Sequence, residues 1–418
     1  MTGTELDWVE PLALAHHFRT QPVMILFYSG RKEAATGHYS YLALGAKNVK
    51  TGTRFEELPQ SNGGDLPEWF GYLGYGMRRD SEDYAQYAPC PVTLPDFRMV
   101  NPQTLLRFDH VNRRLTCHGE LPSLPATLVP PMLPPPPAPP ELLSNFSDDT
   151  YRDAVAETLE QIAAGAFYQA NLTRKFYGHL PAEYDGWDLF LRLAHLSPAP
   201  YSAFLRYQDE VIISSSPEGF LRVEENGTIT TRPIKGSAPR NADVAEDEAR
   251  RAALKNSAKD RAENLMIVDL LRHDLARIAI PGSVQVTEQA ALYSYATIHH
   301  LVSTITARKK PEIPLADILR AAFPPGSMTG APKIAAVRWC DRLEHMERGV
   351  YSGAIGWLGP RDTCDFSVVI RTLVMKGRAF EFQVGGGIVA DSTPEGELRE
   401  TEAKARALRS ALGHAPLA

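Results

Sequence analysis

The sequence predicts an α+β fold with antiparallel β-sheets, in which strands and helices are segregated along the chain. Short strand-like runs dominate its first part, and helical patterns are bundled between later runs of strands. No short-period repeat is present. A doubly wound fold would instead need strands and helices that alternate. The 418 residues exceed one ordinary domain, although a large sheet can absorb the whole length.

The first part of the chain, residues 1–121, is predicted to be a β-rich region that packs onto the core. Val23–Tyr28 is an apolar run typical of a strand, and residues 105–108 and 115–117 form a predicted hairpin. The segment 122–141 follows and begins PSLPATLVPPMLPPPPAPP, a composition that favours a semi-rigid polyproline connector. We expect a surface linker rather than a ligand for a proline-reading module, because no specificity residues flank it.

The third segment, 142–418, carries most of the predicted helices. Ser147 can cap a helix whose apolar residues from Tyr151 to Ile162 lie near one face, and Gly165 can end it. The later predicted elements are strands 211–215 and 228–232 joined across Asn226-Gly227, a helical stretch 243–278, strand 283–289, helices 315–322 and 331–344, strands 352–358, 365–375 and 379–384, and helix 394–412.

Charge and cysteine usage exclude several function classes. The net charge of −6 and the pI near 6.1 argue against general nucleic-acid binding, which needs clustered Lys and Arg. The four cysteines form no CxxC pair, which argues against structural zinc and a disulfide framework. The N-terminus lacks the basic and apolar parts of a signal peptide, and no apolar run is long enough to span a bilayer. We therefore expect a cytoplasmic protein that binds no membrane.

Two pairs of carboxylates are spaced for one helix face each. Asp260 and Glu263 lie three residues apart on one predicted helix, and Glu397 and Glu400 lie three apart on the last one. If these helices converge, a hard divalent cation such as Mg²⁺ would relieve the repulsion. The alternative, that each pair is merely solvated, stays open because such spacings are common on helices.

Lys235 lies in the sequence Pro-Ile-Lys-Gly, just after a predicted strand. Proline and glycine restrict the backbone on both sides, which is unusual for a lysine that only solvates a surface. A nucleophilic amine is one interpretation, and such an amine must lose its proton before it attacks. An ordinary lysine that binds a phosphate or carboxylate is the alternative.

Three further features suggest anion or acid–base chemistry. Gly385, Gly386 and Gly387 directly follow a predicted strand, so their backbone can approach an anion closely, or they form a bare turn. Arg371 ends an apolar strand run and needs a partner, either a substrate carboxylate or a buried protein carboxylate. His300 follows another histidine in a segment expected to be helical, and it is a candidate acid, base or core residue.

Several motifs together resemble the chorismate-utilising enzymes. That family includes anthranilate synthase component I, aminodeoxychorismate synthase component I, and isochorismate and salicylate synthases. The resemblance is strong over about 144–412 and weak over 25–43. Any one motif is weak, but the ordered set is specific: Ser-Pro-Glu at 216–218, Pro-Ile-Lys-Gly at 233–236, Lys-Asp-Arg-Ala-Glu at 259–263, His-Leu-Val-Ser at 300–303, Gly-Ala-Pro-Lys at 330–333, Gly-Val-Tyr-Ser-Gly at 349–353, Ile-Arg-Thr at 370–372 and Gly-Gly-Gly-Ile-Val-Ala-Asp at 385–391.

The resemblance implies a fold of two large antiparallel β-sheets packed together and flanked by helices, as in anthranilate synthase component I. It makes 142–418 the chorismate-binding catalytic domain. It also implies Mg²⁺ that holds the ring carboxylate of chorismate. Glu263 and Glu400 are similar to the direct metal ligands of the family, and Asp260 and Glu397 would lie beside them.

Further roles follow from the same resemblance. Glu218 is similar to the general acid that protonates the departing 4-hydroxyl, and His300 is similar to the histidine near the ring. Arg371 and Tyr351 resemble the residues that bind the enolpyruvyl carboxylate. The three glycines at 385–387 resemble the backbone cradle of the ring carboxylate.

Lys235 indicates the subfamily, because Pro-Ile-Lys-Gly resembles the enzymes that form 4-amino-4-deoxychorismate. Gln169 stands where isochorismate and salicylate synthases would carry a lysine. The expected reaction is chorismate plus ammonia to 4-amino-4-deoxychorismate, for 4-aminobenzoate and folate synthesis, through a covalent adduct on Lys235. A separate glutamine amidotransferase subunit would supply the ammonia. Formation of anthranilate and a non-catalytic regulatory homologue are the alternatives.

Overall fold

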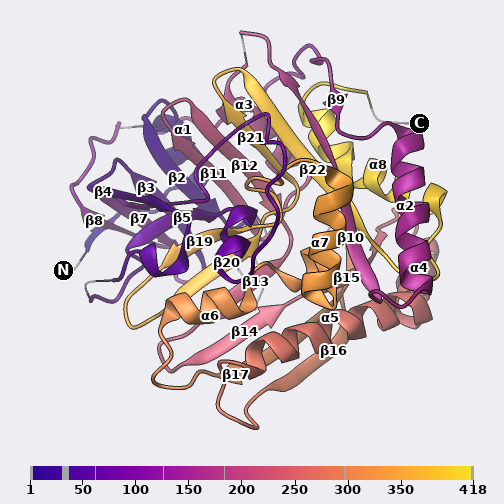
Figure 1. Cartoon of the computed structure of the whole chain (residues 1–418). Coiled ribbons are helices and arrows are strands. Elements are labelled where there is room, and N and C mark those ends of the chain that lie inside the picture. Colours follow the sequence, from indigo (N-terminus) through magenta and orange to yellow (C-terminus); the bar gives the residue numbers. More distant parts are fainter. Residues whose placement is uncertain are drawn as a thin grey trace.

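The computed structural model describes residues 3–30, 37–61, 63–125, 127–182, 184–295 and 298–415. Two large sheets pack face to face, and helices cover their outer faces (Figure 1). All pairings between the named strands in these residues are antiparallel; examples join β10 to β22 and β14 to β17. The predicted α+β class with two large packed antiparallel sheets is confirmed.

The first sheet has 12 strands within the described residues, in the order β1-β8-β7-β3-β2-β11-β12-β21-β22-β10-β18, and β9 pairs with β10. Its strands are β1 (Thr4–Leu6), β2 (Val23–Tyr28), β3 (Tyr39–Leu44), β7 (Thr104–Asp109), β8 (Arg114–Gly119), β9 (Leu143–Ser144), β10 (Gln169–His179), β11 (Tyr201–Tyr207), β12 (Glu210–Ser216), β18 (Gly330–Ala331), β21 (Thr372–Lys376) and β22 (Ala379–Ile388).

The second sheet has 10 strands in the same part of the chain, in the order β15-β17-β14-β13-β20-β19-β5-β6-β4, and β16 pairs with β17. Its strands are β4 (Asn48–Gly52), β5 (Trp69–Leu73), β6 (Phe97–Asn101), β13 (Gly219–Val223), β14 (Thr228–Arg232), β15 (Ile234–Pro239), β16 (Gln285–Ser294), β17 (Ile298–Arg308), β19 (Ala354–Leu358) and β20 (Cys364–Val368).

Five of the eight helices in the described residues begin at a polar side chain that accepts a hydrogen bond from a free backbone N–H group; α1, α6 and α7 do not. The hydroxyl of Ser147 accepts a hydrogen bond from the Thr150 N–H at 3.1 Å, and Ser257 and Thr393 cap later helices in the same way. The helices are α1 (Pro11–His17), α2 (Asp148–Ala163), α3 (Gly186–Leu196), α4 (Val244–Asn256), α5 (Ala258–Ala276), α6 (Leu315–Ala322), α7 (Lys333–Glu344) and α8 (Pro394–Ala411), with the 3-10 turns η1 (Phe55–Glu57), η2 (Tyr75–Asp80) and η3 (Gly326–Met328).

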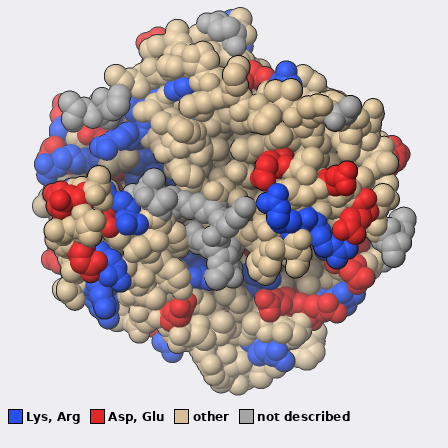
Figure 2. All heavy atoms as spheres, turned by 180° about the vertical axis from the view of Figure 1, so that it is seen from behind, with Lys and Arg blue, Asp and Glu red and all other residues tan. Residues whose placement is uncertain are grey.

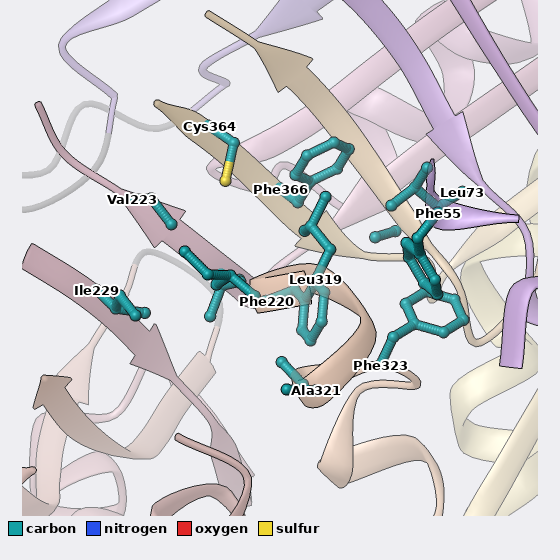
Figure 3. Packing of buried hydrophobic residues seen from close by; sticks show 14 of the residues in the cluster. Phe55, Leu73, Phe220, Val223, Ile229, Leu319, Ala321, Phe323, Cys364 and Phe366 are labelled. Carbon is teal, nitrogen blue, oxygen red and sulfur yellow. The ribbon is translucent and has the colours of Figure 1, made fainter. Parts of the chain in front are cut away.

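Three apolar layers hold these elements together. Residues such as Ile25 and Tyr72 join the inner faces of the two sheets, and α1, α3 and α8 cover the outer face of the first sheet. The second sheet packs on α5 and α6, where Phe220, Leu319 and Phe323 meet (Figure 3). Burial of these side chains is the main force that holds the helices on the sheets.

The strands on either side of residues 122–141 share both sheets. In the first sheet β2 pairs with β11, and in the second β5 pairs with β19. The segment 122–141 therefore does not separate two sheets. The boundaries at 121 and 141 stay a prediction about how the sequence is divided.

One predicted hairpin is wrong. The strands 211–215 and 228–232 are not joined across Asn226-Gly227, because β12 lies in the first sheet and β14 in the second. The Gly227 turn, at a φ of +79°, connects β14 to β13, a strand that the sequence pattern missed. The chain crosses between the sheets at Pro217-Glu218, directly after β12.

Three further boundaries need correction. The predicted strand 365–375 is two strands, β20 and β21, in different sheets, and Arg371 lies at a φ of +52° between them. The glycines at 385–387 do not follow β22 but belong to it, and they pair with β10. The two adjacent histidines lie in strand β17 and not in a helix.

Candidate active site

The three glycines of β22 form one wall of the candidate site. A Cβ at position 387 would lie 3.0 Å from the Nζ of Lys235 and would clash with the amide of Gln169. A Cβ at position 386 would clash with the Oε2 of Glu397. Because these positions carry no side chain, the triplet brings a bare backbone against polar groups from β10, β15 and α8.

The two carboxylate pairs lie close enough to interact. Burial raises the pKa of Glu263, and the neighbouring Glu400 and Asp260 raise it further, while Lys235 and Lys259 oppose them. Helices α5 and α8 therefore approach one another at their acidic faces, which is the condition that the sequence left open. Asp260 also packs within 3.1 Å of a Cβ position on Gly236, beside Lys235.

Glu397 is the most buried of the four carboxylates, with 4% of its surface exposed. Ser392 donates a hydrogen bond to its Oε1 at 2.7 Å, whereas its Oε2 has no hydrogen-bond partner in the described residues. Burial and the nearby Glu400 raise the pKa of Glu397. A buried carboxylate oxygen with no donor is costly, and a bound cation would satisfy it.

Lysines compensate the acidic charge in this structure. Lys404 lies 2.6 Å from Glu400, and its ammonium holds the pKa of that carboxyl below the usual range although partial burial alone would raise it. Lys259 lies 3.9 Å from Glu263. Within the described residues, no three His, Cys, Asp or Glu side chains form a ready-made metal site. The oxygen donors fit Mg²⁺, which keeps several waters, and Glu400 would have to exchange its lysine for the ion.

Glu218 lies directly after β12, where the chain crosses between the sheets, and it is 5% exposed. Burial raises the pKa of Glu218 to about 7, against the lowering effects of a hydrogen bond with Ser327 and of the nearby Lys235. A carboxyl with such a pKa can hold a proton at neutral pH and then release it. The structure thus places a carboxyl suited to general acid catalysis beside the lysine.

Arg371 and Tyr351 lie close enough to affect each other's charge. The backbone of Arg371 accepts a hydrogen bond from the Ser215 N–H at 3.1 Å, which fixes its strained left-handed conformation. Burial lowers the pKa of Arg371, and Tyr351 and Glu400 partly oppose that effect. No carboxylate among the described residues forms an ion pair with its guanidinium. The sequence left two interpretations of Arg371, a protein carboxylate or a substrate carboxylate as its partner. The part of the chain that the structure describes supplies no protein carboxylate for the first.

His300 and its neighbour face opposite sides of β17, as adjacent strand residues must. The Nδ1 of His300 lies 2.6 Å from the hydroxyl of Ser237, two residues beyond Lys235, and its ring packs on Tyr295. His299 instead contacts Ser294 and Asp247. His300 thus points toward the Lys235 segment, whereas His299 contacts Asp247 of α4 on the other side of the strand.

A family model described as chorismate binding enzyme matches residues 21–410. The chain belongs to this family. Aminodeoxychorismate synthase component 1 from Escherichia coli (strain K12) is 39% identical to this chorismate binding enzyme over 84% of the chain and 76% of its own length. Anthranilate synthase component 1 from Saccharolobus solfataricus is 33% identical over 84% of this chain and 82% of its own length. The family resemblance carried by the motifs is confirmed.

Solved structures agree with the fold of this chorismate binding enzyme. Anthranilate synthase component I from Streptococcus pneumoniae TIGR4 has a TM-score of 0.78 and 27% identity, and the match covers 91% of this chain and 94% of that one. MenF, the menaquinone-specific isochorismate synthase from Escherichia coli, has a TM-score of 0.78 at 18% identity, over 98% of this chain and 94% of that one, which supports the fold alone.

Some site residues of this family member were missed or undervalued in the sequence. Ser327 contacts Glu218, but the residues next to Ser327 in the sequence give no sign that it belongs to the site. Lys404 lies one helical turn beyond Glu400, a spacing at which a charge partner is detectable. Gln169 distinguished the subfamilies, yet its position against Gly387 follows only from the pairing of β10 with β22.

The charged surface and one further cavity lie outside the candidate site. Acidic and basic side chains are interspersed on the face shown in Figure 2, and no extended patch of one sign appears there. No helix of the described residues is long and apolar enough to cross a membrane. A cavity of about 710 Å³ between the sheets is lined by Tyr28, Arg107 and Asp365, among others, and contains none of the predicted site residues.

Proposed function

We propose that this protein acts as an aminodeoxychorismate synthase component I, converting chorismate and ammonia to 4-amino-4-deoxychorismate in the cytoplasm. The observation that carries the proposal is the position of Lys235 against Gly387, between Glu218 and the four carboxylates. An amine in that position faces the bound ring. Relatives of this name from Escherichia coli and Salmonella typhimurium, 39% and 40% identical, support the same choice.

Substrate binding uses the charges that lack protein partners. The guanidinium of Arg371, with the Tyr351 hydroxyl, would hold the enolpyruvyl carboxylate of chorismate in a bidentate way. The backbone of Gly385, Gly386 and Gly387 would line the ring carboxylate. These contacts fix the ring so that its C2 and C4 positions face the polar wall.

Magnesium suits the four protein carboxylates, and its charge would balance the negative charge of the chorismate ring carboxylate. Glu263 and Glu400 would hold it directly, and Asp260 and Glu397 would support them. When bound, the ion neutralises the negative charge of the ring carboxylate and orients the diene. The unpaired Oε2 of Glu397 supports this proposal.

The chemistry proceeds as two displacements. Glu218 donates its proton to the 4-hydroxyl, the Lys235 amine forms a bond to C2, both ring double bonds move by one position, and water leaves from C4. Ammonia then forms a bond to C4, the double bonds return, and the C2–N bond breaks with its electrons on Lys235. His300 stands beside the lysine segment and orients it through Ser237.

Ammonia would come from a glutamine amidotransferase subunit. The relatives are named component 1, which indicates a second component for those proteins. In the cell we expect glutamine to serve as the nitrogen source only when that subunit is present. In vitro, ammonium salts should replace it.

Anthranilate formation is the second candidate, because one relative is an anthranilate synthase component 1. That reaction would eliminate pyruvate and place the nitrogen at C2. Mass spectrometry of the product from chorismate, ammonium and Mg²⁺ separates the two reactions. We expect a product that retains the enolpyruvyl group and has no anthranilate fluorescence; anthranilate, or no turnover, would overturn the proposal.

A further inference from the structure

Arg348 and Glu344 form an ion pair that is almost completely buried, with each side chain 1% exposed. The Nε and Nη2 of Arg348 donate to the two carboxylate oxygens of Glu344 at 2.8 and 2.7 Å. Its other N–H groups donate to the carbonyls of Met328 and Asn171 and to the hydroxyl of Ser352, at 2.8 to 3.2 Å. All five donors of the guanidinium are thus used, and each has a different direction.

The pair takes the place of a strand at one edge of β10. The short strands β18 and β9 pair with other parts of β10. Between them, the Asn171 carbonyl accepts from Arg348, and the Thr173 N–H donates to Glu344 at 3.0 Å. Backbone groups on a buried edge need partners, and here two side chains supply them. The ion pair therefore fixes the part of β10 that pairs with the glycines at 385–387.

Another contact of Arg348 leads to the general acid. Met328 is the last residue of η3, and its carbonyl accepts from the Nη1 of Arg348 at 2.9 Å. The residue before it, Ser327, is buried and forms a hydrogen bond with Glu218. The position of the Ser327 hydroxyl thus depends on a turn whose end is held by the guanidinium.

We propose that Arg348 is a positioning residue for the general acid: it holds Met328 so that the Ser327 hydroxyl stays on Glu218. This inference rests on the proposed function, in which Glu218 protonates the departing 4-hydroxyl. Once the proton has left, the Glu218 carboxylate accepts the hydrogen bond of Ser327 and is stabilised by it. Desolvation offsets much of the attraction within a buried ion pair, so we assign Glu344 to orienting the guanidinium rather than to net stability.

The hydrogen bond from Ser327 should be visible in the pH dependence of the reaction. Burial raises the pKa of Glu218 to about 7, and four groups oppose it: the Ser327 hydroxyl, the Lys235 ammonium, the Ile234 N–H and the Lys404 ammonium. Arg348 acts on Glu218 through the first of these. If the Ser327 hydroxyl moves away, the pKa of Glu218 rises further, so the acid keeps its proton to a higher pH.

The test compares pH–rate profiles of Arg348→Lys, Ser327→Ala and the double variant, with chorismate, ammonium and Mg²⁺. An ammonium has three donors and cannot reproduce the fork of a guanidinium. In each single variant, the alkaline limb of kcat/KM should move to higher pH by at least about 0.5 pH unit. In the double variant it should move no further than in Ser327→Ala, because both changes remove the same hydrogen bond.

Arg78→Lys is the matched control. The Arg78 side chain is also 1% exposed, and it pairs with Asp341 of the same helix, α7, at 2.8 Å. The guanidinium groups of Arg78 and Arg348 stack on the same ring, that of Tyr75, at 4.2 and 4.7 Å. Arg78→Lys should lower the Tm as Arg348→Lys does. It should leave the alkaline limb in place, because its guanidinium bonds Tyr75 and Asp341 rather than η3.

The outcomes are distinct. An alkaline limb that stays at its wild-type pH in either single variant, or that moves further in the double variant, would overturn the role of Arg348 and leave the proposed function intact. A wild type that makes no 4-amino product overturns both. Glu344→Gln keeps the size of the side chain but removes the charge that orients the guanidinium, and it supplies the same comparison if Arg348→Lys does not fold.

Discussion

At the scale of single residues, the site includes three side chains with groups that the protein itself leaves unpaired. Among the described residues, Arg371 has no carboxylate partner, the side-chain amide of Gln169 has no hydrogen bond, and one oxygen of Glu397 has no donor. Each absence is costly in a buried position. Unpaired groups gathered in one place support the proposal that this site binds an anionic ligand and a cation.

Arg371→Lys should lower kcat/KM by roughly 30- to 1000-fold, about 2–4 kcal/mol. An ammonium cannot reproduce the bidentate contact of a guanidinium with the substrate carboxylate. Steady-state kinetics at saturating ammonium measures the loss, and Arg272→Lys on the exposed face of α5 is the control. A near-normal kcat/KM would make Arg371 a structural residue of the β20–β21 break.

The activity should depend on the protonation of Glu218. Since its pKa is about 7, kcat/KM should fall about tenfold per pH unit above that value as the general acid loses its proton. A pH–rate profile measures this limb. Glu218→Gln should be much slower and should lack the limb; a limb that persists in the variant would assign it to another group.

The same carboxyl should also affect folding stability. Its pKa is raised above the unfolded value of 4.5, so the wild type loses free energy of unfolding as the pH rises from about 4.5 to about 7. Glu218→Gln mimics the protonated form and should gain on the wild type over that range by up to roughly 3 kcal/mol. Urea denaturation at pH 5 and pH 8 measures the difference; a constant difference would contradict the buried assignment.

Lys235→Ala should abolish the covalent adduct and divert the product. With the amine gone, ammonia can attack C2 directly, so products aminated at C2 should replace the 4-amino compound. Peptide mass spectrometry of enzyme held with chorismate detects the adduct, and Lys255→Ala on the exposed surface of α4 is the control. Unchanged 4-amino product, with no adduct in the wild type, would reduce Lys235 to a binding residue.

At the scale of elements, the site depends on helices that meet from distant parts of the sequence. Glu263→Gln on α5 and Glu400→Gln on α8 should each raise the Mg²⁺ concentration needed for turnover by at least about tenfold. They should also reduce the increase in Tm that Mg²⁺ causes without substrate. Glu402→Gln, on the same helix as Glu400, should behave as the wild type. Normal magnesium dependence in both ligand variants would refute the metal assignment.

The elements with local signals could be predicted, and those set by the sheets could not. Ser147 marks the start of α2 because capping is a local interaction, and 315–322 is the observed α6. The break at Arg371 has no such signal, because an arginine in an apolar run gives no indication of a positive φ. The glycines at 385–387 likewise suggest a turn, whereas pairing with β10 keeps them extended.

At the scale of the whole molecule, residue spacing in the sequence identified the carboxylate pairs of the site but could not show that the pairs lie close together. The i, i+3 pairs on α5 and α8 were visible in the sequence, yet only the two-sheet fold brings those helices together. The ordered motifs supplied the fold because they belong to a family, which composition and periodicity could not do. The position of Gln169 needed the strand register itself.

The proline-rich segment gives α8 a fixed far end. The guanidinium of Arg192 donates to the carbonyls of Pro134, Ser410 and Ala411 at 2.9 to 3.1 Å, so one side chain clamps the segment to the end of the helix. Helix α8 is about 27 Å long, is held by Arg192 at its C-terminal end, and carries Glu397 and Glu400 nearer its N-terminal end. We therefore expect related sequences to vary in length at exposed residues such as Met132. In the part of the segment after Pro134 they should rarely vary in length, because a change there would move the end of α8.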